Sequence, residues 1–190
     1  VKLAYLCDAK QSQINRAAKS FQKHISYNPK LEQDILKVLD DDKVDVMINA
    51  MPDHWHTPGA IMAMKSGMHV YVEKPLTHSF REAALLIEAE KRYGVVTQMG
   101  NQGHTSPGAQ QFKQLQRAGA IDDIVKIEAY KDPSLWFMDA AQRINEFPKA
   151  EPIPSSLNYD LWCGPAKMMP YSRRYHPFDW RGFYIYGNGM

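Results

Sequence analysis

A stretch in the first half of the chain most constrains how this sequence can fold. It contains two short runs rich in β-forming residues, Val44–Ala50 and His69–Val72. Between them, Pro58–Lys65 has the apolar spacing of a helix, and Gly67 is placed to end that helix in the left-handed conformation. Strand, helix and strand in this order predict a βαβ unit, in which two parallel strands are joined by a right-handed crossover.

Polar residues follow both of these predicted strands. A turn expected over Pro52–Pro58, which contains His54 and His56, comes after the first strand, and Glu73-Lys74-Pro75 comes directly after the second. In an open parallel sheet, ligands bind beyond the carboxyl ends of the strands. We therefore expect both clusters to lie on one rim of the sheet and to carry the chemistry of the protein.

Strands and helices alternate through roughly the first two-thirds of the chain. The further predicted elements are strands at Val1–Cys7 and Val95–Met99, and helices at Gln11–His24, Leu31–Leu39, Ser79–Arg92 and Pro107–Ala118. Ser79 and Glu82 have the spacing of a capping box. Repeated strand–helix units predict an α/β domain of the doubly wound, Rossmann type with a parallel sheet.

Asp8 ends the first predicted strand, and two interpretations of it stay open. An acidic residue at this place holds ribose hydroxyls in dinucleotide-binding folds, and it can equally cap the following turn or helix. The sequence contains no G-x-G-x-x-G phosphate-binding loop. If Asp8 is the ribose-binding residue, we expect one strand–glycine loop–helix unit of about 20–30 residues to precede Val1.

The character of the sequence changes near residue 123. Ile124–Tyr130 alternates with period two, which predicts a half-buried strand of a different kind of sheet, so we place a domain boundary at Ala120–Asp123 and expect domains at 1–122 and 123–190. Prolines and aromatic rings crowd the second part. The rings are Trp136, Phe137, Tyr159, Trp162, Tyr171, Tyr175, Phe178, Trp180, Phe183, Tyr184 and Tyr186. A long ordered segment with so many rings is expected to pack over other structure.

Lys74 is the strongest candidate in the sequence for a residue that takes part in a reaction. A strand-end lysine that faces a ligand can hydrogen-bond a hydroxyl or carbonyl oxygen and can exchange protons with it. The alternative is a surface lysine paired with Glu73, and the neighbouring polar cluster favours the first interpretation. The loop Gly100–His104 has the small and amide residues that allow close approach of a planar ring.

His54 and His56 suggest a second possibility, because an HxH pair after a strand also begins the site of many metal-dependent hydrolases. A zinc site needs three or four convergent ligands, and the remaining histidines of this sequence are scattered. We therefore predict no metal site and expect the two imidazoles to shape a loop or to contact an organic ligand. A metal-dependent hydrolase stays the alternative.

The composition and the net charge of the chain exclude several classes of protein. Hydrophobic residues make up 44% of the chain, charged residues 23%, and the net charge is +2. We therefore expect neither nucleic acid nor an anionic membrane as a partner. No apolar run reaches the ~20 residues of a membrane-spanning helix. Cys7 and Cys163 make no disulfide framework, and Cys7, inside an apolar strand, is expected to be a buried, inert thiol.

Four segments together resemble one family. They are MPDHWHTPGAIMAMKSGMHVYVEKPLTHSFREA, GVVTQMGNQGH, PSSLNYDLWCGPA and YHPFDWRGFYIYGNGM. They are similar to the family of glucose–fructose oxidoreductase, inositol dehydrogenase and the rhizopine-catabolism protein (Gfo/Idh/MocA). The resemblance implies a nicotinamide-dinucleotide domain and the start of a second α/β domain with an open, largely antiparallel sheet. It also implies hydride transfer between nicotinamide and a hydroxyl carbon of a sugar or cyclitol.

The resemblance also assigns roles to single residues. Cofactor contacts are expected from Asp8, Pro52, His54, His56, Glu73, Lys74, Asn101 and Gln102, and substrate contacts from Lys74, His104, Tyr175, His176, Trp180 and Arg181. Lys74 is the expected catalytic residue, while a further Asp and a His that acts as principal base are expected beyond Met190. The chain therefore resembles the middle of a longer enzyme.

The sequence and the resemblance also bear on the choice of cofactor, the oligomeric state and the cellular compartment. Asp8 favours NAD over NADP, because a carboxylate repels a 2′-phosphate, and Lys10 softens that preference. Family members commonly associate through the second-domain sheet, so a homo-oligomer is expected. Both a cytoplasmic and a periplasmic bacterial location are compatible with the resemblance. A non-catalytic binding protein on the same fold stays a further alternative to the oxidoreductase.

Overall fold

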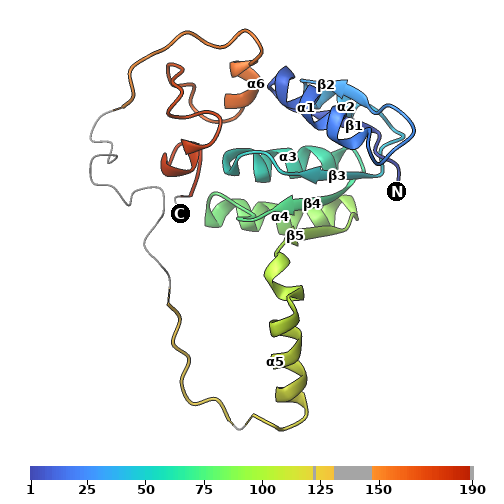
Figure 1. The fold of residues 1–190 in the computed structure, drawn as a ribbon, viewed down its shortest axis with the longest axis vertical. Helices are drawn as coiled ribbons and strands as arrows, with labels where there is room; N and C mark the ends of the chain where they lie inside the picture. Colours follow the sequence, from blue (N-terminus) through green and yellow to red (C-terminus); the bar gives the residue numbers. More distant parts are fainter. Residues whose placement is uncertain (122, 131–146, 189–190) are drawn as a thin grey trace.

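The computed structural model describes residues 1–121, 123–130 and 147–188, and its N-terminal part alternates strands with helices (Figure 1). The strands are β1 (Tyr5–Cys7), β2 (Lys30–Glu32), β3 (Val46–Asn49), β4 (His69–Glu73) and β5 (Thr97–Gly100). The α-helices are α1 (Gln11–Phe21), α2 (Ile35–Leu39), α3 (Asp53–Lys65), α4 (Phe80–Tyr93), α5 (Pro107–Arg117) and α6 (Tyr159–Cys163). Short 3-10 helices are η1 (Gln102–Thr105) and η4 (Asp179–Gly182). This is the expected Rossmann-type α/β arrangement.

The strand pairs among the described residues are all parallel, which confirms the βαβ prediction. β3, β4 and β5 form one sheet in that order, with Asn49 opposite Val72 and Glu73 opposite Gly100. β1 and β2 form a separate parallel pair, so the described strands make two sheets rather than one. The carboxyl ends of β3, β4 and β5 consequently meet at one edge of their sheet.

Helix α3 begins at Asp53, five residues before the expected start at Pro58, so the predicted turn over Pro52–Pro58 is wrong. Pro58 lies inside the helix, where the hydrogen bond that it cannot donate would have gone to the first-turn residue His54. The side chain of Asn49, 1% exposed, donates to the carbonyl oxygens of Trp55 and His56 at 3.3 and 3.0 Å. Tertiary hydrogen bonds of this kind stabilise a first turn that propensity alone does not predict.

The helix predicted over Leu31–Leu39 is also wrong in its first half. Lys30–Glu32 instead pairs with β1, and α2 starts only after Asp34, whose side chain accepts a hydrogen bond from Leu36 N at 2.9 Å. The Glu32 carboxylate accepts from the amides of Gln33 and Asp34, which turns the chain between the strand and the helix. Two local side-chain acceptors therefore break the apparent helical repeat.

The capping of α4 agrees with the sequence, with one difference. The Ser79 side chain accepts from Glu82 N, and Gly94 ends the helix at φ 64°. The Glu82 carboxylate reaches back to His78 N at 2.6 Å, one residue before the expected partner, and also accepts from Thr57 Oγ1 of α3 at 3.1 Å. The cap thus ties α4 to α3 as well as starting the helix.

Two hydrophobic cores hold the molecule together. The first packs α3 and α4 against β4, and its buried residues are Leu39, Ala60, Ala63, Met64, Met68, Val70, Val72, Leu86, Ala89 and Val95. The second is a cluster of mostly aromatic side chains after residue 147, made of Leu157, Tyr159, Trp162, Cys163, Tyr171, Tyr175, Trp180 and Tyr186. The predicted role of the aromatic segment, packing over other structure, is confirmed because this second cluster lies beside α3 (Figure 1).

Residues 123–130 are not a strand in the structure, which corrects the expectation for Ile124–Tyr130. Val125 and Ile127 are 96% and 81% exposed, so no neighbouring strand of the described chain covers or pairs with them. Trp136 and Phe137 lie outside the described residues. The described part also contains no helix long and apolar enough to span a bilayer.

Candidate functional site

A cavity of about 370 Å³ lies beyond the carboxyl ends of β1 and β3. Its wall brings together predicted site residues from three distant segments: Asp8 after β1, Pro52 after β3, and His176, Trp180 and Arg181 from the aromatic part. Open α/β folds bind ligands beyond the carboxyl ends of their parallel strands, where neighbouring strands diverge. The cavity is therefore the best candidate for a ligand site in the described part of the chain.

Asp8 uses one carboxylate oxygen locally and lines the cavity as well. Its Oδ1 accepts a hydrogen bond from Lys10 N at 2.8 Å, which confirms the turn-capping interpretation. The side chain is exposed, yet desolvation by the surrounding protein raises its pKa above the ordinary value, against the opposing amide and charge of Lys10 and the charge of Arg16. Contact with a ribose stays a prediction.

Cys7, beside Asp8 in the cavity wall, is exposed rather than buried, which corrects the sequence-based expectation. Its thiol is nevertheless partly desolvated by the surrounding protein. Desolvation, helped by the carboxylates of Glu32, Asp8 and Asp34, raises its pKa to about 12. The reactive form of a cysteine is the thiolate, and this shift disfavours the thiolate.

Arg181 faces the cavity from η4 and is held by two rings. Its guanidinium carbon lies 4.2 Å from the Trp180 ring centroid and 4.3 Å from that of Phe178, and Nη1 donates to Phe178 O at 3.2 Å. Burial lowers the pKa of Arg181, while the Asp53 carboxylate opposes that shift. The stacked guanidinium is thus a fixed donor in the cavity wall, in a position suited to an anionic or hydroxyl-bearing ligand.

His176 is buried in the same wall and packs edge-on against Trp162 at 5.7 Å. Burial, with a smaller contribution from the charge of Lys10, lowers its pKa to about 4. The ring is therefore neutral at neutral pH and presents one donor and one acceptor nitrogen rather than a positive charge.

The first turn of α3 is bonded to the aromatic segment. The ring nitrogens of His54 lie 3.1 Å from Tyr186 O and 3.0 Å from Trp162 O, and Trp55 Nε1 donates to Leu161 O and Trp162 O at 3.1 Å each. Burial lowers the pKa of His54, although the carbonyls of Trp162 and Tyr186 oppose this shift. In this arrangement neither ring nitrogen of His54 is free to hold a ligand.

His56 is likewise enclosed, at 2% exposed, with one ring nitrogen 2.5 Å from Pro75 O and the other 2.7 Å from Met51 O. All four ring nitrogens of the His54–His56 pair therefore meet main-chain carbonyl oxygens. Among the described residues there is no group of three or more His, Cys, Asp or Glu side chains that could hold a metal ion. The arrangement of the pair is that of a structural element, which argues against the hydrolase alternative.

Gly164 makes close approach of α6 to Trp55 possible, and we expect Gly164→Ala to destabilise the fold by about 2 kcal/mol. Its φ of 48° is unfavourable for other residues, and an added Cβ would lie 2.0 Å from Trp55 Cζ2. Chemical unfolding would measure the loss. Gly119→Ala has a positive φ and open space, and Gly108→Ala has open space alone, so the two variants separate strain from clash. Equal stability of all three variants would contradict the contact.

The remaining predicted residues lie on the rim formed by β4 and β5. Lys74 is exposed, and no ion pair among the described residues includes it. Glu73 Oε1 instead accepts from Gln102 Nε2 at 2.8 Å, so the alternative of a Glu73–Lys74 surface pair is not what the structure shows. Asn101 and His104 are exposed in the following loop, where His104 Nδ1 lies 3.3 Å from Lys113 Nζ.

Tyr175 is 1% exposed inside the aromatic core, so it supports the cavity from behind rather than lining it. Among the cavity-lining side chains that sequence reasoning did not assign to the site are two amides, Gln13 and Gln33, and two indoles, Trp55 and Trp162. The indole between two histidines was the only signal for Trp55. Gln33 follows β2, and the incorrect helix prediction placed it away from the strand ends.

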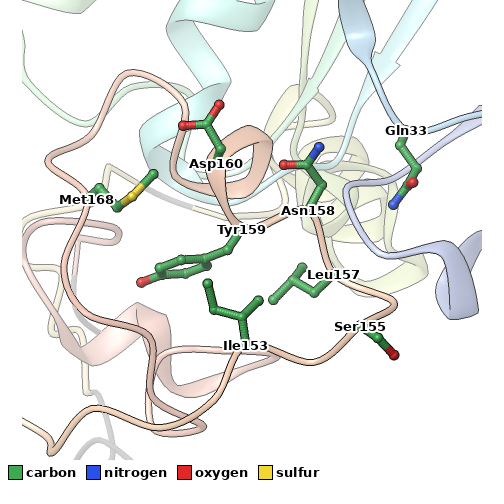
Figure 2. A pocket seen from close by; sticks show the side chains of 8 residues that line it. All are labelled: Gln33, Ile153, Ser155, Leu157, Asn158, Tyr159, Asp160 and Met168. Atoms are coloured by element: carbon green, nitrogen blue, oxygen red, sulfur yellow. The ribbon is translucent and has the colours of Figure 1, made fainter.

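A second hollow, of about 550 Å³, shares Gln33 with this cavity and has fewer polar groups free to bind a ligand (Figure 2). Ile153, Leu157 and Tyr159 form its apolar side. Its amide side chains are used locally, since Asn158 Oδ1 accepts from Leu161 N at 3.1 Å and Gln33 Nε2 donates to Ala9 O at 2.8 Å. We therefore do not regard this open hollow as the functional site.

Comparison with known families agrees with this geometry. Residues 1–101 match the Gfo/Idh/MocA model described as an oxidoreductase family with an NAD-binding Rossmann fold. The chain belongs to the Gfo/Idh/MocA oxidoreductase family. Residues 114–190 match the model of a C-terminal α/β domain of the same family. Gfo/Idh/MocA membership confirms the family named from the motifs.

Individual relatives share parts of the chain. The α-N-acetylgalactosaminidase of Shewanella oneidensis is 31% identical over 96 residues, which cover 48% of this chain and 21% of that protein. The structure of an NAD-binding oxidoreductase from Klebsiella pneumoniae is 29% identical with a TM-score of 0.54, covering 62% of this chain and 30% of that one. Levoglucosan dehydrogenase, in complex with NADH and levoglucosan, is 25% identical with a TM-score of 0.55 and the same coverage. The chain spans about a fifth of the length of the curated relatives that it matches.

Proposed function

We propose that this chain forms the cofactor-binding part of an NAD-dependent oxidoreductase that acts on a hydroxyl carbon of a sugar or cyclitol. The observation that carries the proposal is the cavity beyond β1 and β3, which gathers Asp8, Pro52 and Arg181 at the place where a Rossmann-type fold receives its dinucleotide. Membership of a family of NAD-binding oxidoreductases supports the same reaction class.

The residues present fit a dinucleotide. Asp8 has its Oδ1 on Lys10 N, so Oδ2 is available to accept hydrogen bonds from ribose hydroxyls. The same carboxylate disfavours a 2′-phosphate, which supports NAD over NADP. When bound, the nicotinamide supplies the hydride acceptor or donor. The chain itself supplies the ribose contact and an aromatic wall that excludes water.

Lys74 is proposed to act on the substrate oxygen. Its ammonium is exposed at the end of β4, without an ion-pair partner in the described chain, so it can donate to an oxygen on which negative charge develops. The same rim also holds Asn101 and the helix turn that contains His54 and His56. Glu73 lies there too, and its carboxylate is fixed by Gln102. Lys74 and Asn101 are both exposed on this rim, where a substrate can reach them.

The proposed substrate class rests on sugars named for relatives. Levoglucosan dehydrogenase and α-N-acetylgalactosaminidase both act, by their names, on carbohydrates. His176, Trp180 and Arg181 offer rings and donors that suit a polyhydroxylated ligand. We further propose, from the family resemblance, that copies associate through the open sheet of the second domain.

A glycoside hydrolase is a second candidate, because the Shewanella α-N-acetylgalactosaminidase is 31% identical over 96 residues, which cover 48% of this chain. The two candidates differ in products. The oxidoreductase converts a sugar hydroxyl to a carbonyl while NADH accumulates, whereas the hydrolase releases a free sugar from a glycoside with no net change in NADH.

Asp8→Ala tests the cofactor assignment. In the complete protein we expect it to weaken NAD(H) binding roughly tenfold, since a charge-assisted hydrogen bond is lost, and to abolish the preference over NADP(H). Calorimetric titration with both dinucleotides measures the two effects. Asp42→Ala, which removes the same charge from the exposed loop before β3, is the matched control and should change neither. Equal affinity of the unmodified protein for NAD(H) and NADP(H) would refute the assignment.

A further inference from the structure

The imidazole of His56 joins two loops of the rim. The ring is 2% exposed, with Nδ1 2.5 Å from Pro75 O and Nε2 2.7 Å from Met51 O. Met51 follows β3 and Pro75 follows β4, and the two strands are neighbours in one sheet. One side chain therefore bridges the carboxyl ends of two adjacent parallel strands.

Both contacts of the His56 ring place a nitrogen against a main-chain carbonyl oxygen. A carbonyl oxygen only accepts hydrogen bonds, so each ring nitrogen that bonds to one has to carry a proton. Either neutral tautomer satisfies one carbonyl, and the doubly protonated ring satisfies both. The backbone of His56 is itself held, because Asn49 Nδ2 donates to His56 O at 3.0 Å. The bridge thus starts from a fixed point in the first turn of α3.

The bridge ends one residue from Lys74. Before Lys74, the Glu73 carboxylate accepts from Gln102 Nε2 at 2.8 Å and from Lys74 N at 3.3 Å. After it, the Pro75 carbonyl faces His56. The main chain of Lys74 is therefore anchored on both sides, whereas its side chain is exposed and enters no ion pair among the described residues.

We propose that His56 is a positioning residue, which fixes Lys74 through the Pro75 carbonyl and touches neither cofactor nor substrate. The inference rests on the proposed function for the role of Lys74, but the bridge itself is a property of the protein without ligands. Fixing the backbone of a charged donor keeps its ammonium where charge develops, and small displacements of such groups reduce rates strongly.

Two measurements on the complete protein test the bridge. In the unmodified protein, nitrogen NMR of the His56 ring should show a hydrogen-bond coupling to the carbonyl carbon of Met51, of Pro75 or of both, because either neutral tautomer donates to one of them. In His56→Phe, which keeps the ring and removes both donors, we expect the Lys74 amide to exchange with solvent at least tenfold faster. His54→Phe is the matched control, because its ring bonds to Tyr186 O and Trp162 O in the same helix turn. That variant should leave Lys74 exchange within about twofold.

The outcomes separate this inference from the proposed function. Faster Lys74 exchange in His56→Phe, combined with full activity of Lys74→Met, would keep the bridge and overturn the reaction. Unchanged exchange in a folded His56→Phe would overturn the bridge, whatever the activity. Restoration of slow exchange by His56→Gln, which keeps one amide donor, would support it further. If neither variant folds, a coupling of the His56 ring to the Pro75 carbonyl in the unmodified protein supports the proposal, and the absence of that coupling overturns it.

Discussion

Lys74→Met should lower the turnover of the complete protein about 100-fold, equivalent to about 3 kcal/mol in barrier height. The exposed ammonium at the end of β4 is the group proposed to stabilise charge on the substrate oxygen, and methionine keeps the apolar stem without the charge. Binding of NAD(H) should weaken only modestly, because Asp8 and the cavity wall are untouched. Steady-state turnover on a sugar substrate measures the effect.

Lys65→Met is the matched control for this variant. Lys65 is exposed at the carboxyl end of α3, at the opposite end of the helix from the rim, so the same substitution there should leave turnover near normal. A thermal melt of each preparation separates loss of chemistry from loss of folding. Near-normal turnover of Lys74→Met would show that Lys74 has no part in the reaction.

The stability of the fold should fall when the pH is lowered from 6.5 toward 4. The folded protein holds His176 neutral, with a pKa of about 4, whereas in the unfolded chain the imidazole has its ordinary pKa of about 6.5. The unfolded state therefore gains protons first, and the free energy of unfolding should decrease by about 3 kcal/mol across this range. Burial of His54 shifts its pKa in the same direction and adds to the slope.

Chemical unfolding at several pH values measures this dependence. His176→Gln should remove most of the slope, since glutamine does not titrate and keeps a polar side chain in the wall. His24→Gln alters an exposed histidine and should leave the slope intact. A His176→Gln protein that keeps the full pH dependence would show that His176 is not the buried group responsible.

The repeating elements could be predicted because their signals are local. Gly67 and Gly94 do end α3 and α4 at positive φ, and Ser79 caps α4 as its spacing indicated. Parallel pairing of β3 and β4 followed from the βαβ order. These features depend on neighbouring residues in the chain, which is why the sequence carries them.

The errors arose where distant contacts decide the structure. α3 extends through His54 and His56 because Asn49 and the Tyr186–Trp162 carbonyls hold its first turn, and no local pattern records those bonds. Lys30–Glu32 is a strand because β1 pairs with it, although the apolar residues of Leu31–Leu39 have the spacing of a helix. Residues 123–130 alternate like a strand, yet a strand forms only with a partner.

The residues of the candidate site, too, were predicted where local signals place them and missed where distant contacts do. Asp8, Pro52, His176, Trp180 and Arg181 were expected from motifs, and the structure places all five in one cavity. Tyr175 was expected beside them and is buried behind them instead. Lys74 lies on the rim as predicted, at the end of β4, because its place follows directly from the strand before it. The places of Trp55 and Gln33 in the cavity wall depend on which helix and strand ends meet. The sequence does not show this, so both residues were missed.

Dinucleotide binding in the cavity can be measured by energy transfer from protein tryptophans to NADH. Trp55, Trp162 and Trp180 all line the cavity, so NADH bound there lies within transfer distance of three indoles. In the complete protein we expect saturable quenching of tryptophan emission with matching NADH emission. NAD should compete with this signal, and Asp8→Ala should weaken it roughly tenfold. Tryptophan emission that does not respond to saturating NADH, in a folded preparation, would contradict dinucleotide binding in this cavity.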